Sequence, residues 1–256
     1  MADREGRTDN RDEEQPFIAH LIELRDRILR SVIGVGLAFA ALAYYANDIY
    51  ALLAEPLLRH MPAGTQMVAI DVASPFFTPF KLTLVVALVL AVPWVLYQAW
   101  AFVAPGLYKR EKKLALPLLV SAVLLFYAGC AFAFFVVLPA VFGFLTHVTP
   151  DGVAMMTDIS AYLDFVLVLF LAFGLSFELP VALVILALLG WVTPAQLREG
   201  RGYAVVGIFV VAAVLTPPDV VSQLMLAIPM CLLYEAGIIA AAMVAPRTSA
   251  DGVDAG

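Results

Sequence analysis

The most regular feature of the sequence is a series of long apolar runs that alternate with short polar or charged stretches. Six runs are candidates for membrane-spanning helices, at about residues 28–46, 82–100, 114–138, 162–189, 203–215 and 220–245. About 20 apolar residues in a helix are needed to cross a hydrocarbon core of about 30 Å. The run at 203–215 is shorter than this, so we expect the last two helices to be short and the turn between them to lie at membrane depth, sheltered by protein or a thinned bilayer. The pattern predicts an all-α, polytopic membrane protein with six transmembrane helices.

A change of pattern near Pro16 separates an N-terminal tail from the membrane domain. Residues 1–15 are polar and show no apolar periodicity, which predicts a disordered cytoplasmic tail. After them, apolar residues recur at helical spacings of three and four, at Phe17, Leu21, Leu24 and Ile28. This spacing predicts an amphipathic helix that leads into the first span, with Glu23–Arg27 and Asp26–Arg30 as ion pairs one turn apart. Residues 246–256 form a second, C-terminal cytoplasmic tail.

Lysine and arginine residues gather on one side of the predicted membrane topology. The N-terminal segment, the connections after the second and fourth spans and the C-terminal tail carry thirteen of the fifteen. The opposite side has only Arg59 and Lys81, and Lys81 lies at the mouth of the second span, where its ammonium group can reach the membrane surface. By the positive-inside rule, both termini are predicted to be cytoplasmic.

The composition excludes an ordinary soluble domain, because 63% of the residues are hydrophobic and only 14% are charged. The two cysteines lie within apolar runs, and the three histidines are far apart in the sequence, so neither a disulfide nor a metal site is expected. The chain has no nucleotide-binding loop, no HExxH string and no paired aspartates within a span. We therefore expect no enzyme activity, no cofactor and no nucleic-acid partner.

Several strings resemble, in order and spacing, the TatC family, the polytopic receptor subunit of the twin-arginine protein translocase. They are HLIELRDRIL at 20–29, YANDIY at 45–50, DVASPFFTPFKL at 71–82, YQAWAFVAPGLYKREKK at 97–113, FGLSFELPV at 173–181 and LTPPDVVSQ at 215–223. The resemblance covers roughly residues 16–245 and implies one six-helix membrane domain over that range. The short tail at 246–256 departs from relatives that carry a longer charged extension.

The resemblance also implies a function. It makes the chain a signal-peptide receptor and core subunit of a complex that exports folded proteins across the cytoplasmic (inner) membrane of a bacterium, driven by the proton-motive force. The implied partners are single-span TatA-type and TatB-type subunits, the twin-arginine signal peptides of folded cargo, further copies of the chain in a larger complex, and the lipid bilayer.

Two cytoplasmic carboxylates are candidates for binding the paired arginines of a signal peptide. Glu23 lies on the amphipathic helix, and Glu111 is the single acid among four bases, at Lys109, Arg110, Lys112 and Lys113. A guanidinium matches a carboxylate with two parallel hydrogen bonds, which a lysine ammonium cannot copy. The resemblance adds Arg25 and Phe102 to this signal-peptide site. The alternative is that Glu111 only balances its basic neighbours, that Glu23 only pairs with Arg27, and that Phe102 is an ordinary interfacial aromatic.

Glu178 is the most unusual residue of the apolar runs, because it falls near the middle of the fourth. Ionisable groups at this depth usually face protein or a water-filled cavity, and Pro180 can open the helix locally. The resemblance implies that Glu178 contacts the partner subunits, and Thr216 and Gln223 are further candidates for intramembrane polar contacts. The alternatives are an acid that fixes helix packing and ordinary capping by the other two. On the outer side, three residues are expected to shape a periplasmic cap: Pro56, Asp71 and Asp219.

Three other functions stay open from the residues alone. One is a proton-coupled transporter of small solutes that uses Glu178 as a relay, although the two halves of the chain show no repeat. The second is an intramembrane hydrolase, for which no motif is present. The third is a passive assembly scaffold that binds partners without preferring Arg-Arg peptides.

Overall fold

The fold is a bundle of long helices, as the sequence predicts. The computed structural model describes residues 6–52, 68–103, 115–148, 158–216 and 220–244, without the side chains of residues 6–19, 142 and 145–148. The helices within these residues are α1 Gly6–Leu42, α3 Ser74–Val103, α4 Ala115–Phe132, α5 Leu138–Val148, α6 Ile159–Phe177, α7 Leu179–Leu188, α8 Pro194–Glu199, α9 Arg201–Leu215 and α10 Val220–Val244. A 3₁₀ turn at Ala43–Tyr45 leads from α1 into a helical segment at 46–52. The described residues contain no β-strand, only the isolated bridge between Val68 and Asp158.

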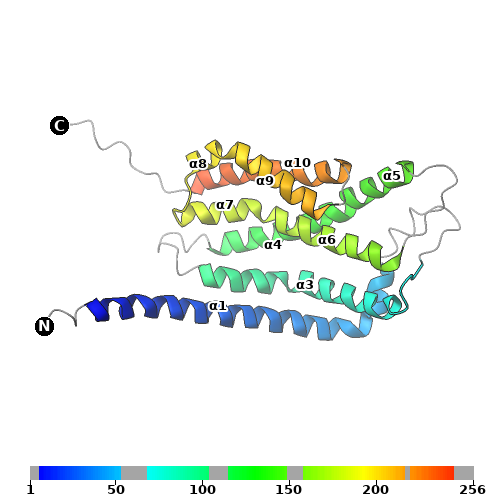
Figure 1. Ribbon diagram of the computed structural model, residues 1–256, viewed down its shortest axis with the longest axis horizontal. Helices are drawn as coiled ribbons and strands as arrows, with labels where there is room; N and C mark the ends of the chain where they lie inside the picture. The colour runs from blue at the N-terminus through cyan, green and yellow to red at the C-terminus, as the bar shows by residue number, and fades with distance from the viewer. Residues whose placement is uncertain (1–5, 53–67, 104–114, 149–157, 217–219, 245–256) are drawn as a thin grey trace.

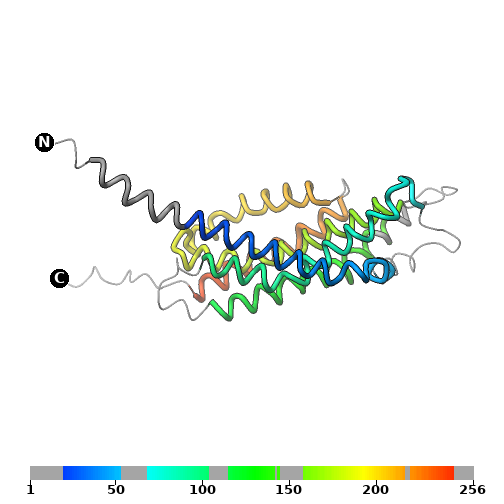
Figure 2. Tube along the Cα trace, turned by 90° about the horizontal axis from the view of Figure 1, so that it is seen from below, coloured from blue at the N-terminus to red at the C-terminus, as the bar shows by residue number. Residues whose placement is uncertain are grey.

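The long helices run side by side along the long axis of the molecule (Figure 1). α1 begins and α10 ends at the same end of the bundle, at the left of the figure. We call this the inner end, after the orientation that the lysine and arginine count predicts, and the opposite one the outer end. α1 packs mainly on α3, α4 on α6, and α10 on α7 and α9. α9 lies at the edge of the bundle (Figure 2), with Val206, Val210 and Val214 exposed.

Five helical segments are long and apolar enough to cross a membrane, and α9 is a sixth, shorter apolar helix. The expectation that the last two helices are short is right for α9, with 15 residues, but wrong for α10, which has 25. Pro229 lies inside α10 without ending it, so the whole apolar run remains one helix.

Several helix boundaries differ from the sequence prediction; α3, for example, begins at Ser74 and not near residue 82. α1 begins at Gly6, inside the segment predicted to be a disordered tail. Arg, Glu and Gln are good helix formers, so a helix established in the apolar part can continue outward through polar residues. The third span, predicted to end at residue 138, continues as a π-helical segment at Ala133–Val137 and then as α5. Pro139 would interrupt a regular α-helix, and the wider π turn that precedes it accommodates the missing hydrogen bond.

α4 and α6 approach each other closely through a glycine. A Cβ atom at Gly129 of α4 would lie 2.5 Å from the carbonyl oxygen of Phe173 on α6. At the facing position of α6, a Cβ at Gly174 would lie 2.6 Å from the ring of Phe126. Small residues at such crossings let the backbones pack closely, and this packing is one of the forces that associate helices within a bilayer. Phe173 is fully buried at this contact and is the largest of the fully buried side chains in the described part of the chain.

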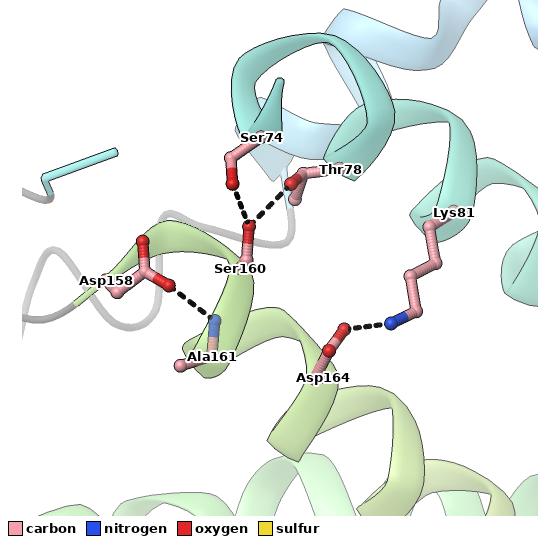
Figure 3. A network of polar contacts seen from close by, with 7 residues as sticks. All are labelled: Ser74, Thr78, Lys81, Asp158, Ser160, Ala161 and Asp164. Carbon is pink, nitrogen blue, oxygen red and sulfur yellow. Dashed lines mark hydrogen bonds and ion pairs between the residues drawn. The ribbon is translucent and has the colours of Figure 1, made fainter. Parts of the chain in front are cut away.

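The outer ends of α3 and α6 are joined by a polar network (Figure 3). The Ser160 hydroxyl lies 2.8 Å from that of Ser74 and 3.1 Å from that of Thr78. Lys81 donates to Asp164 on α6, so its ammonium group is paired within the protein instead of only reaching to the membrane surface. Because the two partners are 83 residues apart, no local pattern could reveal this pair. The network fixes the beginning of one long helix against another.

Candidate functional site

At the inner end, α1 and α3 bring together a group of polar and aromatic side chains. We call it the inner cluster, and it consists of His20, Glu23, Arg27, Gln98 and Phe102. The Arg27 guanidinium donates through Nη2 to Glu23 Oε1 at 3.2 Å and through Nη1 to Gln98 Oε1 at 3.2 Å. Gln98 is only 2% exposed, so its amide presents a fixed acceptor to Arg27. The predicted ion pair between Glu23 and Arg27 is therefore confirmed, and the bond to Gln98 anchors it on α3.

An aromatic contact closes the other side of the inner cluster. The rings of His20 and Phe102 are stacked, with centroids 4.2 Å apart and planes inclined by 19°. His20 is exposed and Phe102 is half-buried. The helical repeat places His20, Glu23 and Arg27 on one side of α1, since they are three and four residues apart. The same reasoning applies to Gln98 and Phe102 on α3.

The inner cluster has the chemistry of a cation site. The side chain of Glu23 is 36% exposed, so its carboxylate is open to solvent while one of its oxygens contacts Arg27. A carboxylate has four lone-pair positions and can accept a second, bidentate guanidinium. The stacked rings beside it offer an apolar surface against which the flat face of a guanidinium can pack.

Two of the predicted signal-site residues lie elsewhere. Arg25 is on α1 but points to solvent, and its guanidinium pairs with Asp26 at 2.8 Å. The predicted Asp26–Arg30 pair is therefore wrong, because Asp26 engages its exposed sequence neighbour instead. Glu111 lies outside the described residues. Sequence reasoning missed Gln98 and His20, although the glutamine was visible as a polar residue within an apolar run.

Glu178 occupies a break between α6 and α7 in the middle of the predicted fourth span. It ends α6, and its carbonyl accepts from the Ala182 N–H at 2.9 Å as α7 begins. Pro180, in the first turn of α7, lacks an N–H and so favours a break over a continuous helix. The structure therefore has a one-residue interruption close to where the sequence predicts a local opening of the helix.

The side chain of Glu178 lines an apolar groove of about 540 Å³ between α6, α7, α9 and α10. The groove wall includes Leu171, Leu175, Leu179, Val211, Leu215 and Met230. Glu178 Oε1 is buried, and no group among the described residues donates a hydrogen bond to it. A buried acceptor without a donor is unfavourable, so this oxygen has unused binding capacity inside an apolar groove.

The other two intramembrane candidates have partners inside the bundle. The buried Thr216 hydroxyl donates to the Ala212 carbonyl at 2.8 Å, at the end of α9. Gln223 donates from Nε2 to the Phe209 carbonyl at 3.2 Å and so joins α10 to α9. The Thr216 bond is of the capping type that the sequence left open as an alternative, whereas the Gln223 bond joins two helices.

Only one of the three predicted cap residues lies in the described part of the chain. Asp71 is at the outer end, just before α3, where its carboxylate accepts from the Ala73 N–H at 3.5 Å. Pro56 and Asp219 lie outside the described residues. Asp71 therefore takes part in the turn that starts α3, where its carbonyl accepts from the N–H of Ser74, a member of the polar network, at 3.1 Å.

Comparisons with known proteins agree on one family. The family model described as "Sec-independent protein translocase protein (TatC)" matches residues 19–229. The chain is 59% identical over 236 residues to the Sec-independent protein translocase protein TatC of Azotobacter chroococcum, covering 92% of each protein. It is 57% identical over 224 residues to the protein of the same name from Escherichia coli, covering 88% of this chain and 87% of the relative.

The fold also matches a solved structure, described as the crystal structure of the twin arginine translocase receptor TatC. The TM-score is 0.78 at 36% sequence identity, and the match covers 88% of this chain and 99% of the solved one. The residues that the family model matches, 19–229, include the inner cluster and Glu178. The chain therefore belongs to the TatC family of Sec-independent protein translocase proteins, and it is a multi-pass transport subunit of the bacterial inner membrane.

Proposed function

We propose that this chain is the receptor for twin-arginine signal peptides and the core subunit of its translocase, with the receptor site at the inner cluster. The observation that carries the proposal is the Glu23 carboxylate, which already holds one guanidinium at the exposed junction of α1 and α3. A site with this chemistry is suited to the guanidinium of a signal peptide. Phe102 contributes ring surface, and Glu111 and Arg25 are proposed to complete the site from the neighbouring cytoplasmic segments.

The experiment that tests this proposal is a binding titration with two matched peptides. The full chain in detergent is titrated with a labelled signal peptide that carries Arg-Arg, and with the same peptide carrying Lys-Lys. Because only guanidinium offers a bidentate fork to a carboxylate, the Arg-Arg peptide is expected to bind at least about tenfold more tightly. Equal affinities would favour the passive scaffold over the receptor.

The groove at Glu178 is proposed as the contact for single-span TatA-type or TatB-type subunits. Its apolar wall fits the side of a membrane helix, and its one buried acceptor would take a hydrogen bond from a polar side chain on that helix. Thr216 and Gln223 would assist as acceptors, through the Thr216 hydroxyl oxygen and the Gln223 amide oxygen, while they keep the bonds that they donate within the bundle. We propose that the complex contains several copies of the chain. We also propose that the proton-motive force drives transport, since the sequence has no nucleotide-binding loop.

Glu178→Leu is expected to lower co-purification of the single-span subunits about fivefold. The substitution removes one interhelical hydrogen bond, which contributes about 1 kcal/mol to association. Glu178→Gln keeps an acceptor in the same place and is expected to retain most of the subunits. Both variants should bind the Arg-Arg peptide as the original chain does, because the inner cluster is untouched. The measurement is quantitative recovery of the subunits on the affinity-tagged chain, with Glu199→Gln on α8 as a control. Full recovery and full transport by Glu178→Leu would assign Glu178 to helix packing alone.

A further inference from the structure

We infer that Arg27 is an intramolecular competitor of the signal peptide's arginine: in the free protein it contacts both Glu23 and Gln98, and when a peptide binds it gives up Glu23 and keeps Gln98. This inference rests on the proposed receptor function and adds to it an intramolecular competitor. The starting point is that the candidate receptor carboxylate is not empty, since it already contacts a guanidinium of the same chain.

The contact between Arg27 and Glu23 is of a kind that an incoming arginine can replace. It uses one nitrogen of Arg27 and one oxygen of Glu23, at 3.2 Å. Charge-assisted N–H···O bonds in strong bidentate pairs are usually about 2.7–2.9 Å long. A peptide guanidinium that approaches from solvent can form two such bonds, because the Glu23 side chain is 36% exposed.

Gln98 gives Arg27 a place to remain after the exchange. The Arg27 side chain is only 23% exposed, and leaving its guanidinium without a partner would be costly. The amide oxygen of Gln98 already accepts from the other terminal nitrogen of Arg27, at 3.2 Å. Because Gln98 is buried on α3, it keeps that position whether or not Glu23 is engaged. The exchange therefore breaks the bond of Arg27 to Glu23 and leaves its bond to Gln98 in place.

A competitor and a positioning residue make opposite predictions. If Arg27 only held Glu23 in the right orientation, removing it would weaken peptide binding. If Arg27 competes, removing it frees the carboxylate and also removes a positive charge that repels a peptide with two arginines. The sign of the effect decides between the two roles.

The test is the affinity of the Arg-Arg peptide for Arg27→Gln in the full chain. We expect binding about two- to fivefold tighter, because the peptide no longer has to displace Arg27 from Glu23. The free energy of one partly exposed ion pair corresponds to a change of this size. Arg30→Gln is the matched control, since Arg30 is exposed on the same helix and makes no ion pair with Glu23 among the described residues. It removes the same charge without freeing the carboxylate, so its gain should be smaller and should vanish at high salt. Unchanged or weaker binding by Arg27→Gln would overturn the inference.

Gln98→Leu supplies a second test with the opposite sign. Without the amide, Arg27 depends on Glu23 alone, so the peptide should bind about twofold more weakly. The loss of affinity should disappear when Gln98→Leu is combined with Arg27→Gln. A loss that persists in the double variant would indicate a general packing defect at Gln98 and would count against the competitor role of Arg27. Glu23→Gln distinguishes a failure of the proposed receptor site from a failure of the competitor role. If that variant binds as tightly as the original chain, the proposed use of Glu23 fails. If it binds weakly while Arg27→Gln brings no gain, only the competitor role fails.

Discussion

Glu23→Gln is expected to weaken binding of an Arg-Arg signal peptide by about tenfold to a hundredfold. A hydrogen bond to a charged group contributes about 1.5–3 kcal/mol, which corresponds to this range of affinity. The substitution keeps the size of the side chain but removes its charge and replaces one acceptor oxygen with a donor NH₂ group. A guanidinium has only donors, so one half of the bidentate contact turns from attraction into repulsion. A Lys-Lys peptide, which makes a single-point contact, should lose much less.

Asp26→Asn is the matched control for this prediction. It removes one negative charge from the same helix, three residues further on, where the carboxylate pairs with Arg25 and not with the inner cluster. Because Arg25 is itself proposed to belong to the site, Arg25→Gln is measured beside it to identify any effect that passes through that residue. Titrations of labelled peptide by fluorescence anisotropy measure all variants under the same salt concentration. Comparable losses for Asp26→Asn and Glu23→Gln would mean that the helix attracts the peptide only by its overall charge.

Gly129→Leu is expected to prevent stable packing of α4 against α6. The first added atom would lie 2.5 Å from a backbone oxygen of α6, which cannot move aside as a flexible side chain can. Overpacking of a well-filled core usually costs about 1–3 kcal/mol, and a clash with backbone belongs at the upper end of that range or above it. We expect little monodisperse protein after extraction in detergent, and a clearly lower melting temperature for what remains.

Gly36→Leu tests whether this loss is specific to the helix crossing. Gly36 also lies in a membrane helix, α1, but no atom comes within 4 Å of a Cβ atom built there. Both changes replace glycine with a good helix former, so their local propensity effects are alike. The control should be extracted and should melt like the original chain. Normal melting of Gly129→Leu would contradict the close approach of α4 and α6.

The sequence was a good guide to the helices because each span has its own strong apolar signal. The run from Tyr162 to Leu189 predicted both a long helix and, through Pro180, its interruption at Glu178. The boundaries were harder to predict, since polar residues such as those after Gly6 can continue a helix that is established elsewhere. The π-helical segment before Pro139 has no pattern of its own and could not be predicted.

The candidate sites were predictable only where both partners lie within one helical turn. Glu23 and Arg27 are such a pair, and the structure contains it. The partner that anchors them, Gln98, is 71 residues from Arg27, and the stacking of His20 on Phe102 also depends on how α1 packs on α3. The roles of all these residues in binding stay predictions.

Photo-crosslinking from position 102 tests whether the inner cluster receives the signal peptide. A photoreactive phenylalanine analogue at Phe102 preserves the ring that stacks on His20, and the chain is assayed in inverted membrane vesicles with Arg-Arg and Lys-Lys peptides. We predict a crosslink to the Arg-Arg peptide that is lost in Glu23→Gln and is absent with Lys-Lys. Equal crosslinks to both peptides, or none to either, would contradict a twin-arginine receptor site at the junction of α1 and α3.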